Sequence, residues 1–211
     1  PILLGDREVI LELKAEIGFD ADVPIYDPKT PEEDKRRFHY ADIFWKERRR
    51  KGISLLDAQK WMRERNYFAA MMVHEGEADA LVTGYSRSYP SVVKPMLQLI
   101  GKAPGISIVA STNMMMTSRG PIFFSDTAIN PDPSADEIAK IAVMTANIVR
   151  LFGLVPVIAM VSFSNFGSSN HASAAKLREA VAYLHKYYPD LVVDGEIQAD
   201  FALNPEMLKA K

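Results

Sequence analysis

Short apolar runs alternate with longer amphipathic segments along the whole chain, and this alternation constrains the fold more than any other feature of the sequence. Runs of apolar and β-branched residues predict strands, whereas apolar positions with a period of about 3.6 residues predict helices. Strands that alternate with helices favour a mainly parallel sheet covered by helices. We therefore expect an α/β fold with strands at residues 2–4, 23–26, 80–82, 106–110, 121–124, 155–161 and 191–193.

Polar residues and glycine mark where several helices begin or end. Ser134 and Glu137 form a capping-box pattern ahead of a long helix, and Ser54 marks another start. Asn66 is expected to cap a further helix, and Gly52 ends a charged helical region. The predicted helices cover residues 6–17, 31–51, 67–75, 90–100, 134–152 and 172–188, with one more after Ser54 and another from 202 onward.

Two apolar stretches are predicted to be buried. Val155–Val161 has no polar interruption, which is typical of a strand that is buried on both faces. Met114–Met116 is expected in a core or in a subunit interface, because methionine side chains adapt to irregular gaps. With 211 residues, of which 48% are hydrophobic, the chain is long enough for one large domain or two small ones.

Composition excludes several functional classes. The formal net charge of −2 gives no general attraction to nucleic acid or to anionic membranes, and no apolar run is long enough to span a bilayer. The absence of cysteine excludes a disulfide framework and a thiolate zinc site, and it fits a reducing, cytoplasmic setting. No metal site is expected, because no metal-ligand spacing relates the four histidines, which are His39, His74, His171 and His185.

The glycine- and proline-rich segment Gly101–Gly105 is predicted to be a hinge between two lobes, residues 1–100 and 101–211. The first residues resemble a strand entered in mid-protein, and the last ones resemble a helix that is cut before its stop signal. We therefore expect a fragment that lacks the N-terminal part of the first lobe and the C-terminal part of the second.

Thr83–Ser91 is the first candidate ligand loop, because it leaves a predicted strand and enters a helix, where open α/β sheets bind ligands. Gly84 permits a sharp turn, and Arg87 adds positive charge beside free helix N–H groups. Ser86 and Ser88 offer hydroxyl groups to a phosphate or carboxylate. The same residues fit a helix cap with a solvated arginine equally well.

Residues 162–171 form the second candidate loop and hold more small polar groups than a tight turn needs. One interpretation is a polar wall for a phosphorylated or pantetheine-bearing ligand. The alternative is an Asx or serine turn followed by a helix cap.

Three further polar stretches have structural alternatives. Asp126 either positions a substrate or a basic side chain, or shapes the proline-rich entry to the next helix, as Asp132 is expected to do. Asp194–Glu196 places an acid after a strand, where it could serve as a general base, but a turn at Gly195 explains the pattern more simply. Arg48–Lys51 fits the negative end of a helix dipole, although one of its side chains could reach an anion.

Several segments, read in order, resemble the phosphate acetyltransferase family. Within that family, Ser164–Ser168 is similar to the version found in hybrid malic enzymes, whereas free-standing transferases tend to carry Ser-Thr-Lys-Gly-Ser there. The resemblance covers nearly the whole chain through the segments Asn66–Val73, Gly76–Gly84, Asp126–Ser134 and Asp194–Asp200.

The resemblance implies a three-layer α/β/α structure, similar to isocitrate and isopropylmalate dehydrogenases, with two lobes and a cleft. The family binds CoA and acetyl phosphate in that cleft. Lys94 stands where the family commonly has arginine. Lysine keeps the positive charge but cannot form the two parallel hydrogen bonds of a guanidinium group. The residues implied to bind a CoA ester or phosphate are Thr83, Gly84, Ser86, Arg87, Ser88, Lys94, Asp126, Ser164, Asn165, Gly167 and Ser168.

Besides a domain that has lost ligand binding and only holds subunits together, two functions follow from the resemblance. The first is a regulatory and oligomerisation domain at the C-terminus of an NADP-dependent malic enzyme, sensing acetyl-CoA or a related metabolite. Its partners are the upstream malic enzyme modules and further copies of the chain. Those modules convert malate to pyruvate and carbon dioxide with NADP and Mg²⁺ or Mn²⁺, so no cofactor is expected in these residues. The alternative is an active phosphate acetyltransferase, although the family's C-terminal Ser-Arg and downstream Asp have no counterpart here.

Overall fold

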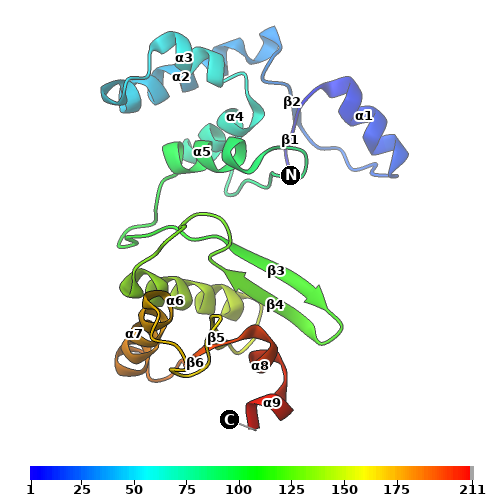
Figure 1. The fold of residues 1–211 in the computed structure, drawn as a ribbon. Helices are drawn as coiled ribbons and strands as arrows, with labels where there is room; N and C mark the ends of the chain where they lie inside the picture. Colours follow the sequence, from blue (N-terminus) through cyan, green and yellow to red (C-terminus); the bar gives the residue numbers. More distant parts are fainter. Residues whose placement is uncertain (210–211) are drawn as a thin grey trace. The chain divides into compact units, whose positions relative to one another are not determined.

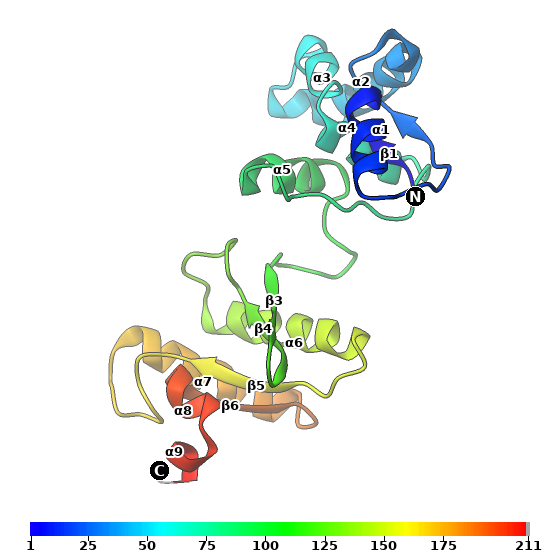
Figure 2. The same cartoon turned by 90° about the vertical axis from the view of Figure 1, so that its right-hand side faces the viewer.

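The computed structural model describes residues 1–209 and divides the chain into two compact units, Pro1–Ala103 and Pro104–Lys211. Figures 1 and 2 show helices and short strands in each unit, which confirms the expected α/β class. The three-layer, isocitrate dehydrogenase-like arrangement with two lobes and a cleft stays a prediction. Among the described residues, no helix has both the length and the apolar character needed to cross a membrane.

Unit 1 is mainly helical, and its strands β1 and β2 pair in parallel. Its elements are, in chain order, β1 (Leu3–Leu4), α1 (Arg7–Glu16), β2 (Ile25–Tyr26), the 3-10 helix η1 (Pro31–Glu33), α2 (Asp34–Arg48), the 3-10 helix η2 (Arg49–Lys51), α3 (Leu55–Trp61), α4 (Arg65–His74) and α5 (Tyr89–Leu99).

Unit 2 combines a hairpin, a parallel strand pair and two long helices. β3 pairs with β4 in antiparallel orientation, and β5 pairs with β6 in parallel orientation. Its elements are β3 (Thr112–Thr117), β4 (Gly120–Ser125), α6 (Ala135–Leu151), β5 (Val157–Val161), α7 (Ala172–Tyr187), β6 (Val192–Ile197), α8 (Ala199–Leu203) and α9 (Pro205–Lys209).

Capping boxes fix the start of two helices, as the sequence predicted. The Ser134 hydroxyl accepts from the N–H of Glu137 at 3.3 Å, and the Glu137 carboxylate accepts from the N–H of Ser134 at 2.8 Å. Ser54 and Asp57 form the same reciprocal pair at the start of α3. Each box satisfies helix N–H groups that would otherwise lack a partner, so these starts are set locally.

Asn66 does not cap α4, so that prediction is wrong. The helix begins at Arg65, with Glu64 in the cap position, and Asn66 lies in the first turn. Its side-chain amide bonds Thr83 and Ser91 instead. Asparagine is common at caps, but the same amide also serves contacts that are distant in the sequence, and sequence alone does not separate the two uses.

Within residues 1–209, the strands form three two-stranded sheets rather than one larger sheet. β3 and β4 are antiparallel because a turn at residues 118–119 joins them directly and reverses the chain. Strand β3 was not predicted from the sequence. The strands predicted at residues 80–82 and 106–110 are wrong, because these segments have no ladder partner among residues 1–209. An apolar run favours extended backbone but does not supply the neighbouring strand that a ladder requires.

Two stretches predicted to be buried lie at the surface of the unit. In β5 the Met160 side chain is buried but Val157 is 74% exposed, so burial on both faces is wrong. Met114–Met116 is exposed along β3, which pairs with β4 alone. A core position for these methionines is therefore wrong, and a role in a subunit interface stays a prediction.

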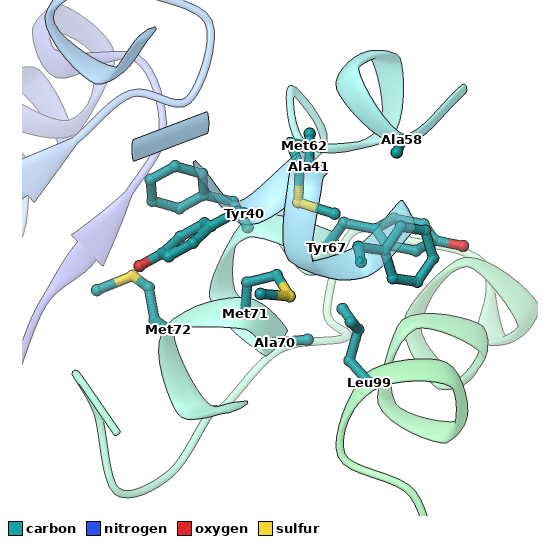
Figure 3. Close-up of a cluster of buried hydrophobic side chains, with 11 residues drawn as sticks. Tyr40, Ala41, Ala58, Met62, Tyr67, Ala70, Met71, Met72 and Leu99 are labelled. Carbon is teal, nitrogen blue, oxygen red and sulfur yellow. The ribbon is translucent and has the colours of Figure 1, made fainter. Parts of the chain in front are cut away.

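The core of unit 1 is built around α4, in which every residue from Tyr67 to Met72 is buried. The Phe44 ring of α2 meets the Tyr67 ring edge-on, with centroids 5.7 Å apart, and the Trp61 ring stacks on Tyr67 at 5.3 Å and also contacts Phe44 at 5.8 Å. Figure 3 shows the side chains of α4 interleaved with those of neighbouring helices, including Tyr40 and Leu99. A helix that is apolar on all sides is stable only when it is enclosed in this way.

The core of unit 2 lies between α6, α7 and the β5–β6 pair. Ala139, Ala142 and Ala146 are spaced at helical intervals and form one buried face of α6. Leu184 of α7 and Met160 of β5 pack in the same cluster. Because alanine has a small side chain, this face allows α7 and the strands to approach α6 closely.

Replacing Phe44 tests this description of unit 1. Phe44→Ala removes a fully buried ring, so we expect the free energy of unfolding of unit 1 to fall by about 3–5 kcal/mol. Both tryptophans, Trp45 and Trp61, belong to unit 1, so urea unfolding followed by tryptophan fluorescence reports on that unit. Phe38→Ala is the matched control, because Phe38 is 54% exposed on the same helix. Equal midpoints for the two variants would contradict the packing.

Candidate functional site

The loop of residues 83–91 lies beside the first turn of α4 and borders two adjoining pockets of unit 1. Their volumes are about 260 Å³ and about 610 Å³. Arg65, Asn66 and Arg87 line both pockets, so they adjoin along these three side chains. The smaller pocket is also lined by Trp61, Glu64, Tyr67, Ser91, Lys94 and Pro95.

The predicted ligand residues of unit 1 divide between the two pockets. Thr83, Gly84 and Ser86 line the larger pocket, Lys94 lines the smaller one, and Arg87 lines both. Ser88 lines neither.

Ser88 instead occupies the cap position of α5. Its carbonyl oxygen accepts from the N–H of Ser91 at 3.0 Å and from the Ser91 hydroxyl at 2.7 Å. The helix-cap interpretation therefore describes the end of the loop, and the pocket interpretation describes its beginning.

Positive charge dominates the smaller pocket, where Arg65, Arg87 and Lys94 outnumber the single carboxylate of Glu64. Within residues 1–209, the side chains of Arg65 and Arg87 form no ion pair or hydrogen bond, so their guanidinium N–H groups are free to bind an anion. The ammonium group of Lys94 lies 5.1 Å from the centroid of the Trp61 ring, a cation–π contact. The pocket therefore combines unpaired cations with an aromatic wall.

In unit 2, the candidate loop of residues 162–171 folds around the buried carboxylate of Glu196. Oε1 of this carboxylate accepts from the Gly167 N–H at 2.9 Å and from the Ser164 hydroxyl at 2.8 Å, and Nη1 of Arg178 lies 2.8 Å from it. Burial opposes ionisation, but these donors outweigh burial and lower the pKa of Glu196 below its usual value.

The side chains of Ser164 and Asn165 are buried and engaged within the protein. The Asn165 amide donates to Oε1 of Gln198 at 2.5 Å and accepts from the Gln198 N–H at 2.8 Å. The exposed Ser168 closes the turn by accepting from the N–H of Asn165 at 3.0 Å. These contacts match the turn that the sequence allowed as an alternative. A ligand role for Ser164, Asn165, Gly167 and Ser168 stays a prediction, as does a cleft that both candidate loops face.

Gly195 allows β6 to lie directly against β5 just before Glu196. Its φ is +137°, and an added Cβ would lie 2.7 Å from the carbonyl oxygen of Met160 and 2.8 Å from its Cβ. The turn predicted at Gly195 is therefore wrong. The glycine is needed inside a strand, where another backbone approaches too closely for a side chain.

Asp126, another predicted ligand residue, organises the segment that follows β4. One carboxylate oxygen accepts from the Ser111 N–H at 2.9 Å and from the Ser111 hydroxyl, and the other accepts from the Asn130 N–H at 2.7 Å. The N–H groups of Ala128 and Ile129 also point to this carboxylate. Partial burial opposes ionisation, but the donors lower the pKa of Asp126 well below its usual range. Because a carboxylate offers about four lone-pair sites, its acceptor capacity is used within the protein.

The basic run Arg48–Lys51 lies at the end of α2 and in η2, and two of its side chains contact other residues of unit 1. Nε of Arg48 donates to the carbonyl oxygen of Gln98 at 2.9 Å, near the end of α5. The Arg49 guanidinium lies 5.5 Å from the centroid of the Trp45 ring. Arg48 thus reaches the end of α5, which is distant in the sequence, whereas the expected interaction of the run with the end of its own helix stays a prediction.

Comparison with known protein families identifies the kind of domain to which these two units belong. The whole chain, residues 1–211, matches the family model of phosphate acetyl/butaryl transferases. The chain belongs to this family. The phosphate acetyltransferase of Thermoanaerobacterium thermosaccharolyticum is 38% identical to it, and the match covers all of this chain and 65% of that protein.

Two malic enzymes also match this transferase-family chain. The NAD-dependent malic enzyme of Rhizobium meliloti is 36% identical, over 100% of this chain and 28% of that protein. The NADP-dependent malic enzyme of Salmonella typhimurium is 35% identical, over 96% of this chain and 27% of that protein. The crystal structure of a phosphotransacetylase from Streptococcus pyogenes is similar with a TM-score of 0.79 and 38% identity, over 100% of this chain and 64% of that one. The chain thus spans less than two thirds of these relatives.

Reading the sequence of this transferase-family chain did not reveal several residues of the two sites. Arg65 and Trp61 line the smaller pocket but stand in helices whose charges and aromatic residues look ordinary. The sequence pointed to an acid in Asp194–Glu196, but it did not reveal that Glu196 is buried and accepts the hydrogen bonds of the loop before it. The spacing of residues along a helix did not indicate these roles, because the residues that they contact lie far away in the sequence.

Replacing Asp126 tests its role as a structural anchor. At pH 7, Asp126→Asn should lower the free energy of unfolding of unit 2 by about 2 kcal/mol, because hydrogen bonds to a charged acceptor each contribute roughly 1.5–3 kcal/mol. The folded-state pKa lies below the unfolded value of about 3.9, so the stabilisation is complete above that pH and declines as the pH falls through the folded pKa. Urea unfolding followed by the NMR signals of unit 2 amides measures this difference at each pH.

Asp132→Asn is the matched control for this measurement. Asp132 forms an ion pair with Lys176 at 2.5 Å, and its side chain is 90% exposed. We expect no measurable change in the free energy of unfolding, because exposed ion pairs contribute little. The anchoring role would be contradicted if Asp126→Asn changed the free energy of unfolding as little as Asp132→Asn does, or if its effect on that free energy increased as the pH is lowered.

Proposed function

We propose that this chain is the C-terminal regulatory and oligomerisation domain of an NADP-dependent malic enzyme, and that unit 1 binds acetyl-CoA or a related anionic acyl compound. The observation that carries the proposal is the presence of Arg65 and Arg87, unpaired within the described residues, on both pockets. CoA esters carry phosphate groups, and a guanidinium group binds phosphate through two parallel hydrogen bonds.

The malic enzyme context is supported by the matches to longer proteins of that name. The chain corresponds to only 28% and 27% of the two malic enzymes, which leaves room for separate modules that oxidise and decarboxylate malate to pyruvate. In this proposal NADP and Mg²⁺ or Mn²⁺ bind in those modules, outside these residues. Assembly into a homo-oligomer and a cytoplasmic location belong to the same proposal.

Two positions favour binding over acyl transfer. Lys94 stands where the family commonly has arginine, so the smaller pocket has one fork-shaped donor fewer. Phe166 stands where free-standing transferases tend to have lysine, and its ring is 45% exposed. A domain that binds the ligand without turning it over alters malate oxidation if the ligand binds two states of the enzyme with different affinities.

Replacing Arg87 in the full-length protein tests the binding site. Arg87→Ala removes a charged donor common to both pockets, so the Kd for acetyl-CoA should rise about tenfold or more, as expected for the loss of one charge-assisted hydrogen bond. Isothermal titration calorimetry measures this affinity directly. Arg50→Ala is the matched control, because Arg50 is exposed in unit 1 and lines neither pocket. An unchanged Kd for Arg87→Ala, or an equal loss in both variants, would argue against the site.

The second candidate function is an active phosphate acetyltransferase. It is favoured by the 38% identity to the transferase of Thermoanaerobacterium thermosaccharolyticum and to the Streptococcus pyogenes phosphotransacetylase. In that reaction the thiolate of CoA attacks the acetyl carbonyl of acetyl phosphate. The C–S bond forms, and the bond between the carbonyl carbon and the bridging oxygen breaks. Phosphate then leaves as an anion that nearby cations stabilise.

A transfer assay separates the two candidates. We expect the chain of residues 1–211 to form no acetyl-CoA from acetyl phosphate and CoA, because Lys94 and Phe166 stand where transferases tend to have arginine and lysine. Product formation is followed at the thioester absorbance, with the full-length protein assayed in parallel. Turnover by the chain that disappears in Arg87→Ala would favour the transferase.

A further inference from the structure

One side chain ties together the two ends of the loop that carries Arg87. Oδ1 of Asn66 accepts a hydrogen bond from the Thr83 hydroxyl at 2.8 Å, and Nδ2 of Asn66 donates to the carbonyl oxygen of Ser91 at 3.0 Å. Thr83 begins the loop, and Ser91 lies in the first turn of α5. An amide side chain can form both bonds because it has an acceptor and a donor in one plane.

The first half of the loop has little else to hold it in place. Apart from the turn at Tyr85–Ser86, residues 84–87 have no hydrogen bond with any other residue from 1 to 209. Val82 and Tyr85 are fully exposed, and no atom lies within 4 Å of the position that a Cβ of Gly84 would occupy. The bond between Ser91 and Ser88 fixes only the second half. The position of Arg87 therefore depends on the bonds that Asn66 makes on both sides of it.

Asn66 is also next to Arg65 in the first turn of α4, and the two arginines line the same two pockets. A side chain that fixes the Arg87 loop to this turn fixes the two guanidinium groups relative to each other. Two such groups at a set separation bind one phosphate-type anion better than two that must first be ordered, because ordering a loop on binding costs conformational entropy.

We propose that Asn66 is a positioning residue that holds Arg87 near Arg65, so that both arginines bind one anionic group. Thr83 acts through Asn66, because its hydroxyl proton is donated to the amide and not to a ligand. This inference rests on the proposed function of unit 1 and adds the residue pair that sets its affinity. It also gives Thr83 a role different from the direct ligand contact that the family resemblance implies.

Two substitutions at Thr83 test the inference with little change in side-chain volume. Thr83→Val removes the hydroxyl, and Thr83→Ser keeps it. In the full-length protein, titrated with acetyl-CoA by calorimetry, we expect Thr83→Val to raise the Kd about fivefold, the equivalent of one neutral hydrogen bond. Thr83→Ser should bind like the parent protein. Both should unfold at the parent's Tm, because Thr83 is exposed.

Asn66→Ala removes both bonds and should raise the Kd at least as much as Thr83→Val. Arg87→Ala is measured beside these variants and separates two kinds of failure. If Arg87→Ala weakens binding while Asn66→Ala and Thr83→Val do not, the positioning role is wrong and the proposed site stands. If Arg87→Ala has no effect either, both are wrong. Should Asn66→Ala lower the Tm, the comparison of Thr83→Val with Thr83→Ser decides the outcome.

Discussion

The enclosure of α4 is the constraint on which the rest of unit 1 depends. Every residue from Tyr67 to Met72 is buried, so the helix can neither rotate nor slide without opening the aromatic cluster formed with Phe44 and Trp61. Its first turn lies outside that core and carries Arg65 and Asn66 to the pockets. A rigid, apolar helix thus presents two polar residues at a fixed place, which is how a packed core prepares a binding site.

Unit 2 uses its carboxylates in a different way. Asp126 and Glu196 each accept several hydrogen bonds from backbone N–H groups and hydroxyls of their own loops. Such bonds favour the ionised form, so both groups stay charged where partial or full burial would otherwise favour protonation. Many of the polar groups in these loops therefore form hydrogen bonds within the loops themselves. Arg65 and Arg87, whose side chains have no ion-pair or hydrogen-bond partner among residues 1–209, lie in unit 1.

The parts of the structure that could be predicted from the sequence are those with local causes. The helices starting after Ser54 and Ser134 were predictable because each capping box involves residues three positions apart. The segment 80–82 was not, because a strand needs a partner that no local pattern specifies. For the same reason the sequence identified Arg87 as a candidate ligand residue but not Asn66 as its anchor. The contacts of Asn66 span 17 and 25 positions along the chain.

The close approach of β6 to β5 at Gly195 limits how this domain can change during evolution. An alanine there would place its methyl carbon 2.7 Å from the backbone oxygen of Met160, which is a rigid part of the opposite strand. Relief would require the strands to separate, and Glu196 would then move away from the loop it holds. Every substitution at residue 195 that adds a side chain is therefore expected to disrupt the pairing of β5 with β6. This restriction arises from backbone geometry alone, so it does not depend on any ligand that the domain binds.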